Sequence, residues 1–394
     1  MKIGIYGGTF DPPHLGHMAA AQAAIAVLGL DKLIFMPAKR PPHKDLPPNC
    51  APPEDRLAMV ELMADGLLKP DVVEVSGMEL GRTGKSYTCD TLEQLKAQYP
   101  EDELWLLMGT DMFLTLHNWY QAQRILSLAS IAAFARTQSD SGEAMEAQGR
   151  YLSQTYGARV RILQLPQVVS VSSTQVRQQG TGEGLWPPVW GYILRCGLYG
   201  HPVQLKGLSD DDLRAVSHSM IRAKRIAHVR GTEQEAVKLA RRWGANEQHA
   251  RRAAILHDCT KYLELEEQLA ICRQYGIPLD ALEEKAVKLL HSKTGAALAR
   301  YVFGEPEEEY EAIFWHTTGK ADMSLLEKIL YIADYMEPTR DFDGVERLRQ
   351  LAYTDLDAAV LLGTEMSVEE LAERGVPVHP NTLAARDFLK GSDQ

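Results

Sequence analysis

The first 200 residues alternate short apolar runs with longer stretches in which apolar residues recur at helical spacing. A run of four to eight apolar residues is typical of a buried strand, whereas a spacing of three and four residues is typical of an amphipathic helix. The strand-like runs are KIGIYG, KLIFMPA, DVVEVS, ELWLLMG, SIAAFAR and RVRILQLP, and helix-like stretches such as EDRLAMVELMADGLL and CDTLEQLKAQ lie between them. This alternation predicts βαβ units that build a parallel sheet, that is, an α/β Rossmann-like domain over residues 1–200.

The rhythm changes after about residue 207. Apolar residues at helical spacing then dominate in SDDDLRAVSHSMIRAKRIAHV, EQEAVKLARRWG, NEQHARRAAILHD and SLLEKILYIADYM, and no convincing strand pattern follows. An all-α domain is therefore predicted over residues 207–394. The join between the two parts, GLYGHPVQLKGLS, is rich in glycine and ends at Ser209, a preferred residue at a helix N-cap.

The bulk composition limits the function classes. A chain of 394 residues is long for one hydrophobic core, and its net charge of −11 argues against broad nucleic-acid binding, which needs a basic surface. A pocket for a small nucleotide needs only a few cations and stays open. The five cysteines show no CxxC spacing, no run is apolar enough to cross a bilayer, and the start lacks the apolar core of a signal peptide. A cytoplasmic protein with reduced thiols is expected.

The loop between the first strand and the first helix reads GGTFDPPHLGH. Glycines let the backbone approach a ligand closely, and the free N–H groups at the start of the following helix favour an anion. His14 and His17 lie about one turn apart with Gly16 between them, so both imidazoles can face charge that develops on a phosphate. This loop predicts a phosphate site at the carboxyl end of the first strand.

A second segment, VSVSSTQVRQQG, follows the last strand-like run. Ser172, Ser173 and Thr174 are expected to open the next helix, with Arg177 one turn later. Hydroxyl groups, free N–H groups and a guanidinium together predict further phosphate contacts.

These motifs resemble the nucleotidyltransferase superfamily that carries a GTFDPxHxGH loop. MPAKRPPHK, GKSYTCDTL and GTDMFLTLHNWY are similar to segments of nicotinate-nucleotide adenylyltransferase. The resemblance implies transfer of AMP from ATP to nicotinate mononucleotide, with Mg²⁺ bridging the phosphates and deamido-NAD and pyrophosphate as products. Nicotinamide mononucleotide and phosphopantetheine remain alternative acceptors, and residue types do not decide between the acid and the amide mononucleotide.

The same resemblance assigns roles to individual residues. It implies His14 and His17 as catalytic residues, and Gly7, Gly8, Thr9, Phe10, Gly16, Ser172, Ser173, Thr174 and Arg177 as ATP-binding residues. It implies contacts to the nicotinate nucleotide from His43, Lys44, Ser86, Tyr87, Thr88, Asp111, Trp119 and Arg136. Trp119 would stack on the pyridine ring, which is a suitable use of a large π face.

The second half contains adjacent His257 and Asp258 in LHDCTKY, at a predicted helix end. His228 in RIAHVRGT and Asp334 in YIADYMEPTR lie on predicted helices upstream and downstream. Four nitrogen and oxygen ligands suit Fe, Mn or Co better than a thiolate-type zinc site. His291 in LHSKTGA and His316 in WHTTGK, with Asp258 as a bridge, could hold a second ion, and two close metal ions suit hydrolysis of phosphoesters or phosphoanhydrides.

The order of these motifs resembles the YqeK-type HD family across most of residues 207–394. This resemblance implies symmetrical hydrolysis of diadenosine tetraphosphate to two ADP, with Lys261, Arg340 and Lys320 as phosphate contacts. Either His316 or a metal-bound hydroxide could serve in the reaction. The alternative is a nucleotide-sensing regulatory module with little turnover. A homo-oligomer is compatible with the sequence.

Overall fold

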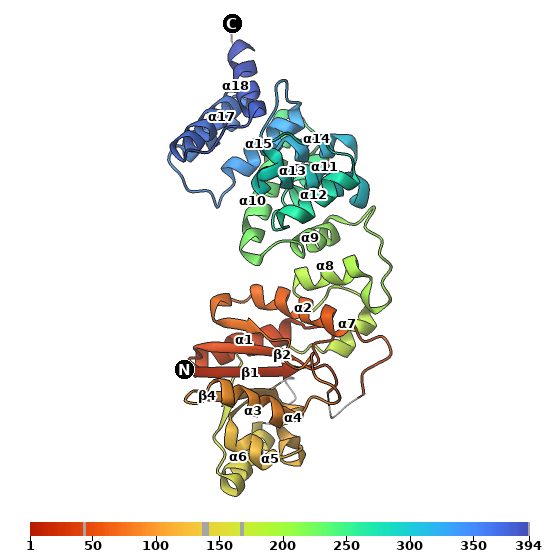
Figure 1. Cartoon of the computed structure of the whole chain (residues 1–394), viewed down its shortest axis with the longest axis vertical. Helices are drawn as coiled ribbons and strands as arrows, with labels where there is room; N and C mark the ends of the chain where they lie inside the picture. The colour runs from red at the N-terminus through yellow and green to blue at the C-terminus, as the bar shows by residue number, and fades with distance from the viewer. Residues whose placement is uncertain (42–44, 136–141, 166–168, 393–394) are drawn as a thin grey trace. The chain divides into compact units, whose positions relative to one another are not determined.

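The chain forms two compact units, Met1–Pro202 and Val203–Gln394 (Figure 1). The computed structural model describes residues 1–41, 45–135, 142–165 and 169–392. His43, Lys44 and Arg136, three of the predicted contacts to the nicotinate nucleotide, lie outside the described residues. Each unit has its own secondary-structure class.

The first unit is built on a parallel sheet. Its strands are β1 (Lys2–Gly8), β2 (Lys32–Pro37), β3 (Val73–Val75), β4 (Glu103–Gly109), β5 (Ser130–Phe134) and β6 (Val160–Leu163). They lie in the order β3-β2-β1-β4-β5-β6, and every neighbouring pair is parallel. The predicted α/β Rossmann-like class is confirmed. The chain adds β2 and β3 on one side of β1 and then β4, β5 and β6 on the other side. The order of the strands therefore reverses between β1 and β4, and such a switch point is where parallel sheets bind ligands.

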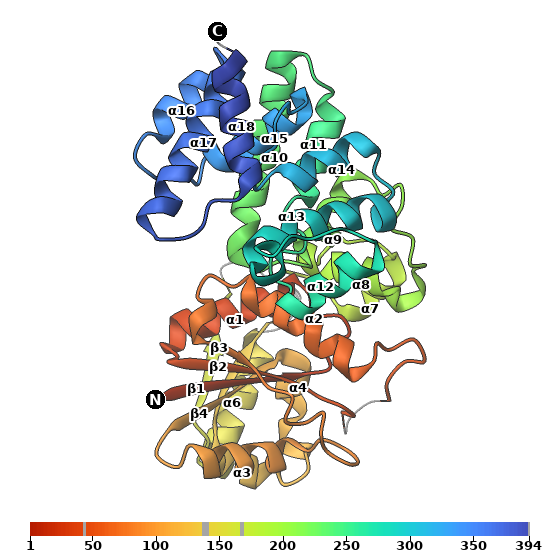
Figure 2. The same ribbon diagram turned by 45° about the horizontal axis from the view of Figure 1, so that its top comes forward.

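Helices cover both faces of this sheet. They are α1 (Leu15–Leu28), α2 (Pro53–Asp65), α3 (Thr88–Gln98), α4 (Thr110–Thr115), α5 (Ala122–Leu128), α6 (Gly142–Tyr156), α7 (Ser173–Gln179) and α8 (Pro187–Cys196), with short 3₁₀ turns η1 (Pro70–Val72), η2 (Leu116–Asn118) and η3 (Leu198–Gly200). Figures 1 and 2 show α1 and α2 on one face and α3 and α6 on the other. Both faces of each central strand are therefore buried, which explains why the strands read as unbroken apolar runs.

Two hydrophobic cores result from the alternation of side chains along the strands. Tyr6 and Phe35 belong to the core under α1 and α2. Ile3, Ile5 and Ile34 belong to the core on the opposite face, with residues of α3 and α6. The paired register of β1 with β2 and β4 keeps each set on its own side.

The described part of the second unit consists of helices and loops, so the all-α prediction is confirmed. The helices are α9 (Asp210–His218), α10 (Ala223–Trp243), α11 (Glu247–Leu256), α12 (Leu265–Gln274), α13 (Val287–Ala297), α14 (Glu307–Trp315), α15 (Leu325–Met336), α16 (Val345–Ala352), α17 (Leu356–Glu373) and α18 (Pro380–Ser392), with the short turns η4 (Glu283–Lys285) and η5 (Leu298–Phe303). Helix α10 packs on α11 and α15, and α14 packs on α11, α13 and α15.

The stretch SDDDLRAVSHSMIRAKRIAHV, in which apolar residues recur at helical spacing, is divided between two helices. A break at 219–222 separates α9 from α10. Ser219 ends α9 by donating its backbone N–H to Ala215, and Arg222 takes an extended conformation as the N-cap of α10. Ser209 caps α9, as expected, because its side chain accepts the backbone N–H of Asp212 at 3.2 Å.

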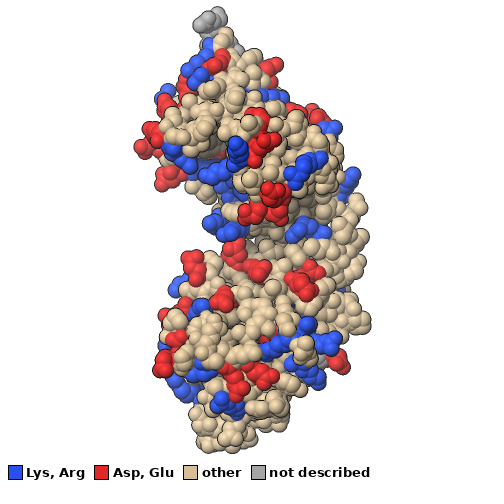
Figure 3. Space-filling view, in the orientation of Figure 1, with Lys and Arg blue, Asp and Glu red and all other residues tan. Residues whose placement is uncertain are grey.

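The surface mixes charges of both signs. On the face drawn in Figure 3, Lys and Arg side chains are interspersed with Asp and Glu on both units. Across the described residues, none of the helices combines the length and the apolar character that a membrane span requires.

Candidate functional sites

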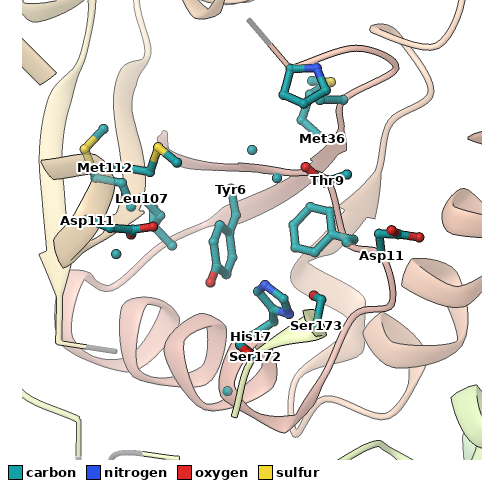
Figure 4. Close-up of a pocket in the computed structure, with 18 of the residues that line it drawn as sticks. Tyr6, Thr9, Asp11, His17, Met36, Leu107, Asp111, Met112, Ser172 and Ser173 are labelled. Atoms are coloured by element: carbon teal, nitrogen blue, oxygen red, sulfur yellow. The ribbon is translucent and has the colours of Figure 1, made fainter. Parts of the chain in front are cut away.

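A cavity of about 810 Å³ lies at the carboxyl ends of β1 and β4. Small-molecule sites typically have volumes of about 300–1,000 Å³. Gly7 and Gly8 at the end of β1 and Gly109 at the end of β4 line the cavity, so it occupies the switch point of the sheet. Figure 4 shows Tyr6 near the middle of the lining, with Asp111 on one side of it.

Two stacked imidazoles form one wall of this cavity. His14 is the N-cap of α1, and its backbone N–H donates to Nδ1 of His17 at 3.1 Å. The ring centroids are 3.7 Å apart. Because Nδ1 of His17 accepts this hydrogen bond, the neutral ring carries its proton on Nε2, which can donate to an anionic oxygen. A Cβ at Gly16 would lie 3.0 Å from the His14 ring and 3.2 Å from the Val169 carbonyl, so glycine allows close packing there.

Asp11 joins the glycine-rich loop to three other segments. Its carboxylate is 2% exposed and accepts the Ala51 backbone N–H at 3.0 Å and the Tyr199 hydroxyl at 2.9 Å. The Arg177 guanidinium donates to its second oxygen at 3.2 Å and also to its backbone carbonyl. Ser173 adds a hydrogen bond to the Pro12 carbonyl at 2.8 Å. Helix α7 is therefore fixed against the loop, and Arg177 is held in place by Asp11.

A fully buried arginine fixes the ends of two strands. Arg56 on α2 donates to the carbonyl oxygens of Thr9 and Ala38, both at 2.7 Å, and to that of Ala51 at 3.2 Å. Thr9 follows β1 directly and Ala38 follows β2. Charge-assisted hydrogen bonds of this kind are stronger than neutral ones, so Arg56 sets the backbone path of the loop that lines the cavity.

The second unit brings six predicted metal ligands together from five helices. His228 lies on α10, His257 and Asp258 follow α11, His291 lies on α13, His316 follows α14, and Asp334 lies on α15. Nε2 of His228 is 2.9 Å from an Asp334 oxygen and 3.4 Å from Nε2 of His257. Nε2 of His291 is 3.2 Å from Asp258 and 3.1 Å from Nε2 of His316. Asp258 thus belongs to two ligand groups, one with His228 and His257 and one with His291 and His316.

The hydrogen bonds fix which nitrogen of each ring is available. Nδ1 of His257 donates to the Ala254 carbonyl at 2.6 Å, and His291 and His316 make the same bond to the residue three positions earlier, at 2.7 and 2.6 Å. In a neutral imidazole the other nitrogen then bears a lone pair. The bare Nε2 atoms converge on one small region, which is the arrangement that a metal ion requires.

Burial keeps these rings neutral and the carboxylates ionised. Desolvation lowers the pKa of His257, His291 and His316 to about 4. Burial alone would raise the pKa of Asp258, but the neighbouring His257 and His291 rings and the Lys261 ammonium hold it well below its usual value. The pKa of Asp334 is also well below its usual value, since the adjacent His228 ring and the Arg340 guanidinium outweigh the effect of burial.

These donors fit a metal ion. Ligand bonds of about 2.1 Å at angles of ~90–109° place two ligand atoms about 3.0–3.4 Å apart, which matches the separations in this cluster. Oδ1 of Asp258 is buried and makes no hydrogen bond within the described residues, so a lone pair remains for a cation. Nitrogen and carboxylate ligands without a thiolate suit Fe, Mn or Co.

A buried carboxylate positions His228. Glu337, at the end of α15, is 0% exposed and lies 3.0 Å from Nδ1 of His228. The backbone N–H of Thr339 donates to its other oxygen at 2.7 Å. A Cβ at Gly231 would collide with this carboxylate, so glycine at that position gives it room. Such contacts fix the orientation of a metal-binding ring and leave Nε2 facing the metal.

Three cations border the cluster. Nε of Arg225 is 2.5 Å from Asp258, Nζ of Lys261 is 2.9 Å from Nε2 of His291, and Arg340 is 3.0 Å from Asp334. Lys320, by contrast, pairs with the buried Glu327 at 2.9 Å. Lys261 and Arg340 therefore lie where a bound phosphate could reach them.

A third group of similar residues has the opposite hydrogen-bond pattern. Nε2 of His379 is 3.1 Å from Asp280 and 3.4 Å from Glu283. Nδ1 of His379 accepts the Asn381 backbone N–H at 3.1 Å, so Nε2 carries the proton and has no lone pair for a metal. Glu283 also pairs with Lys293 at 2.6 Å. This group is a polar link between the start of α18 and the turn before α13.

Comparison with known proteins assigns the two units. A cytidylyltransferase-like family model matches residues 5–179, and an HD domain model matches residues 225–339. A protein of Neisseria meningitidis (strain Z2491), named probable nicotinate-nucleotide adenylyltransferase, is 38% identical over 203 residues that cover 50% of this chain and 98% of that protein. The first half of the chain belongs to the nicotinate-nucleotide adenylyltransferase family. A relative of the same name from Listeria monocytogenes serotype 4a is 34% identical over 201 residues, covering 50% of this chain and 97% of that protein.

The second half carries the HD domain. A solved structure described as a predicted HD superfamily hydrolase involved in NAD metabolism, from Clostridium acetobutylicum, is 38% identical to this chain. The match covers 47% of this chain and 98% of the solved chain, with a TM-score of 0.46. The chain is therefore a fusion of a nicotinate-nucleotide adenylyltransferase family member and an HD domain, and HD domains bind divalent metal ions.

Most residues expected from the adenylyltransferase resemblance line the cavity. These are Gly7, Gly8, Thr9, Phe10, His14, Gly16, His17, Ser86, Thr88, Asp111, Trp119, Ser172, Ser173, Thr174 and Arg177. Tyr87 does not belong to the lining, and its ring packs on that of Tyr120 at 4.6 Å between centroids.

Sequence reasoning missed several residues of both sites. Asp11 and Arg56 act through the backbone of the loop, and Glu79 lines the cavity while accepting a hydrogen bond from Thr91 at 2.6 Å. Burial raises the pKa of Glu79. In the HD domain, Arg225 and Glu337 were missed. The spacing along the chain could have indicated both residues. Arg225 precedes His228 by one helical turn and Glu337 follows Asp334 by one, so each lies on the same helix face as a predicted ligand.

Proposed function

We propose that the first unit transfers AMP from ATP to nicotinate mononucleotide, forming deamido-NAD and pyrophosphate. The main support is the pair of stacked histidines in a cavity at the switch point, within a chain of this family. An oxygen of the mononucleotide phosphate attacks the α-phosphorus of ATP, a new P–O bond forms, and the bond to the bridging oxygen of the leaving pyrophosphate breaks. The attacking phosphate is already ionised, so no general base is needed. Positioning and charge neutralisation then supply the catalysis.

Each role in this reaction falls to a group in the cavity. His17 donates from Nε2 to the α-phosphate oxygens as negative charge builds on them, and His14 supports it through the stacked ring. The hydroxyls of Ser172–Thr174 hold the leaving pyrophosphate. Trp119 stacks on the pyridine ring. Mg²⁺, which accompanies ATP, neutralises part of the triphosphate charge.

We propose that the HD domain binds one or two ions of Fe, Mn or Co and hydrolyses diadenosine tetraphosphate to two ADP. The convergence of imidazole Nε2 atoms with two ionised carboxylates is the observation that supports a metal centre. Bound divalent ions supply charge neutralisation and lower the pKa of water. Arg225, Lys261 and Arg340 hold the phosphates. Water adds to one of the two inner phosphorus atoms, the bond from that atom to the oxygen shared with the other inner phosphate breaks, and that oxygen leaves with the second ADP. His316 is one candidate for moving the proton to the leaving oxygen.

A two-variant experiment tests both assignments on the full chain. Activity is measured with ATP plus nicotinate mononucleotide, and separately with diadenosine tetraphosphate plus Mn²⁺. His17→Gln should abolish only the first activity, because glutamine can still accept the His14 N–H but has no imidazole. Asp258→Asn should abolish only the second. Equal use of nicotinamide mononucleotide or phosphopantetheine would contradict the first assignment, and tight nucleotide binding without ADP release would replace the hydrolase by a sensor.

A cytoplasmic location is proposed as well. All five cysteines are free thiols, and Cys89, Cys259 and Cys272 are buried. Structural disulfides are rare in reducing compartments, so free thiols support this location. Retention of five titratable thiols in denatured, freshly purified protein is the expected result.

A further inference from the structure

An exposed aromatic–cation pair lies beside the HD metal cluster. Tyr262 directly follows Lys261, whose ammonium contacts His291 and lies 3.5 Å from Asp258. The guanidinium carbon of Arg222 is 5.4 Å from the centroid of the Tyr262 ring. Arg222 precedes Arg225 by one helical turn, and Arg225 contacts Asp258. The pair is therefore connected to the metal cluster through both of its chain segments.

The pair is open to a ligand. Tyr262 is 36% exposed, and Arg222 is also exposed. Within the described residues, no aspartate or glutamate forms an ion pair with Arg222, although Arg225, Lys261 and Arg340 each pair with a carboxylate of the site. Arg222 thus adds positive charge that the protein does not neutralise.

The first turn of α10 strengthens this preference for anions. It contains no acidic residue, and Arg222, its N-cap residue, makes no side-chain capping hydrogen bond. The helix dipole adds to the charge of Arg222 and Arg225. The metal cluster with its orphaned Asp258 oxygen lies on the same side, two turns along at His228.

We propose that Tyr262 and Arg222 form a nucleoside-binding subsite of the HD centre. The base of a nucleoside 5′-diphosphate group stacks on the Tyr262 ring, Arg222 and Arg225 contact the phosphate next to the ribose, and the outer phosphate reaches the metal cluster. Stacking on an aromatic ring tolerates any base, so the subsite selects nucleotides over inorganic phosphates without selecting one base. This subsite deepens the proposed hydrolase function and rests on it for the identity of the substrate.

The test compares ADP with inorganic pyrophosphate on the full chain. Binding of labelled ADP is measured by equilibrium dialysis with and without Mn²⁺. The binding measured without Mn²⁺ is then subtracted. Tyr262→Ala should weaken the Mn²⁺-dependent ADP affinity about tenfold, the size expected for one stacked base, and leave pyrophosphate affinity unchanged. Tyr262→Phe keeps the ring and should remain within about twofold of wild type.

A matched control is available in the same unit. Tyr301 is also exposed and also lies under an arginine, Arg300, but its ring stacks on Tyr275 at 4.6 Å between centroids. Tyr301→Ala should bind ADP as wild type does.

With diadenosine tetraphosphate as substrate, Tyr262→Ala should raise KM and leave kcat nearly unchanged.

The outcomes separate the subsite from the hydrolase assignment. An unchanged ADP affinity in Tyr262→Ala, an equal loss of pyrophosphate affinity, or absence of Mn²⁺-dependent ADP binding in wild type would each overturn the subsite. If the ADP pattern holds but no variant, wild type included, releases ADP from the dinucleotide, the subsite stands and the proposed hydrolysis is wrong.

Discussion

The two sites are built in opposite ways. In the adenylyltransferase unit, the residues that line the cavity come mainly from loops at the ends of parallel strands, and GTFDPPHLGH supplies several of them in one stretch. In the HD domain, the ligands His228 to Asp334 are spread over five helices. A loop at the end of a strand brings several consecutive residues to the same site, whereas a helix that passes a buried site contributes only one or two side chains to it. A short motif therefore specifies the first site, and only helix packing completes the second.

The chemistry differs in the same way. The first site offers backbone, hydroxyl and imidazole donors, which suit the phosphates of the proposed substrates. The second offers bare lone pairs and ionised carboxylates, which need a cation that the protein holds. The two sites lie in different compact units, so changes at one should leave the other intact.

Asp258→Asn should have the largest effect. Asp258 belongs to both ligand groups, so the substitution removes a ligand from each and one negative charge from the cluster. We expect bound metal to fall by at least half and dinucleotide hydrolysis to drop below detection, with deamido-NAD formation unchanged. Metal analysis and product chromatography measure this. Normal metal content in the variant would contradict the assigned ligand set.

His17→Gln tests the other side of the comparison. Loss of one charge-stabilising donor should lower kcat for adenylyl transfer by about 10²–10³-fold, while HD activity and metal content stay at wild-type levels. His117→Gln is the control, because His117 contacts Gln148 and lies outside the cavity lining. A decrease below about threefold in His17→Gln would remove this imidazole from the reaction.

Glu337→Gln should weaken metal binding without removing a ligand. Loss of a carboxylate that orients a metal-binding histidine typically costs about 10–100-fold in affinity. Mn²⁺ affinity is measured by competition with a chelator. Glu346→Gln, which changes an exposed carboxylate paired with Arg349, should leave the affinity unchanged. If both variants bind Mn²⁺ equally well, the Glu337–His228 contact is only structural.

The pH dependence of Mn²⁺ binding should be shallow. Burial lowers the pKa of three ligand imidazoles to about 4, so protons compete with the metal only as the pH approaches that value. Ordinary histidines, with pKa values near ~6.5, would begin to lose metal below that pH. We expect nearly constant affinity from pH 7.5 to about pH 5.5. A steep loss beginning near pH 6.5 would show that the rings are not desolvated.

Asp280→Asn should have the smallest effect. The His379 group has the residue types of a metal site, but its protonated Nε2 faces the Asp280 carboxylate as an ion-pair partner and offers no lone pair. The free energy of unfolding should fall by at most about 1 kcal/mol, as for one partly exposed ion pair, with metal content unchanged. Urea titration and metal analysis check the two parts. Loss of a bound ion in this variant would show that the His379 group binds a metal ion, and that the assigned protonation of Nε2 is wrong.

Sequence reasoning recovered the fold class and the local motifs because both depend on near neighbours in the chain. The continuous apolar runs predicted all six strands, and Ser209 was recognised as a helix cap. The break between α9 and α10 was not predicted, since Arg222 is an unremarkable residue whose extended conformation depends on packing. Tyr87 was expected in the cavity from the family resemblance, yet its ring packs on that of Tyr120.

The amino-acid sequence by itself determined the alternation of strands and helices, the change to an all-helical second half, and which histidines and carboxylates are the candidate metal ligands. Periodicity and loop composition are local properties, and they act before any long-range contact forms. Only the tertiary structure decided that Asp11 clamps Arg177, that Glu337 orients His228, and that hydrogen bonds to backbone carbonyls leave the metal-facing nitrogens bare. These properties depend on distance and on protonation, and residues far apart in the chain acquire both only when the helices pack.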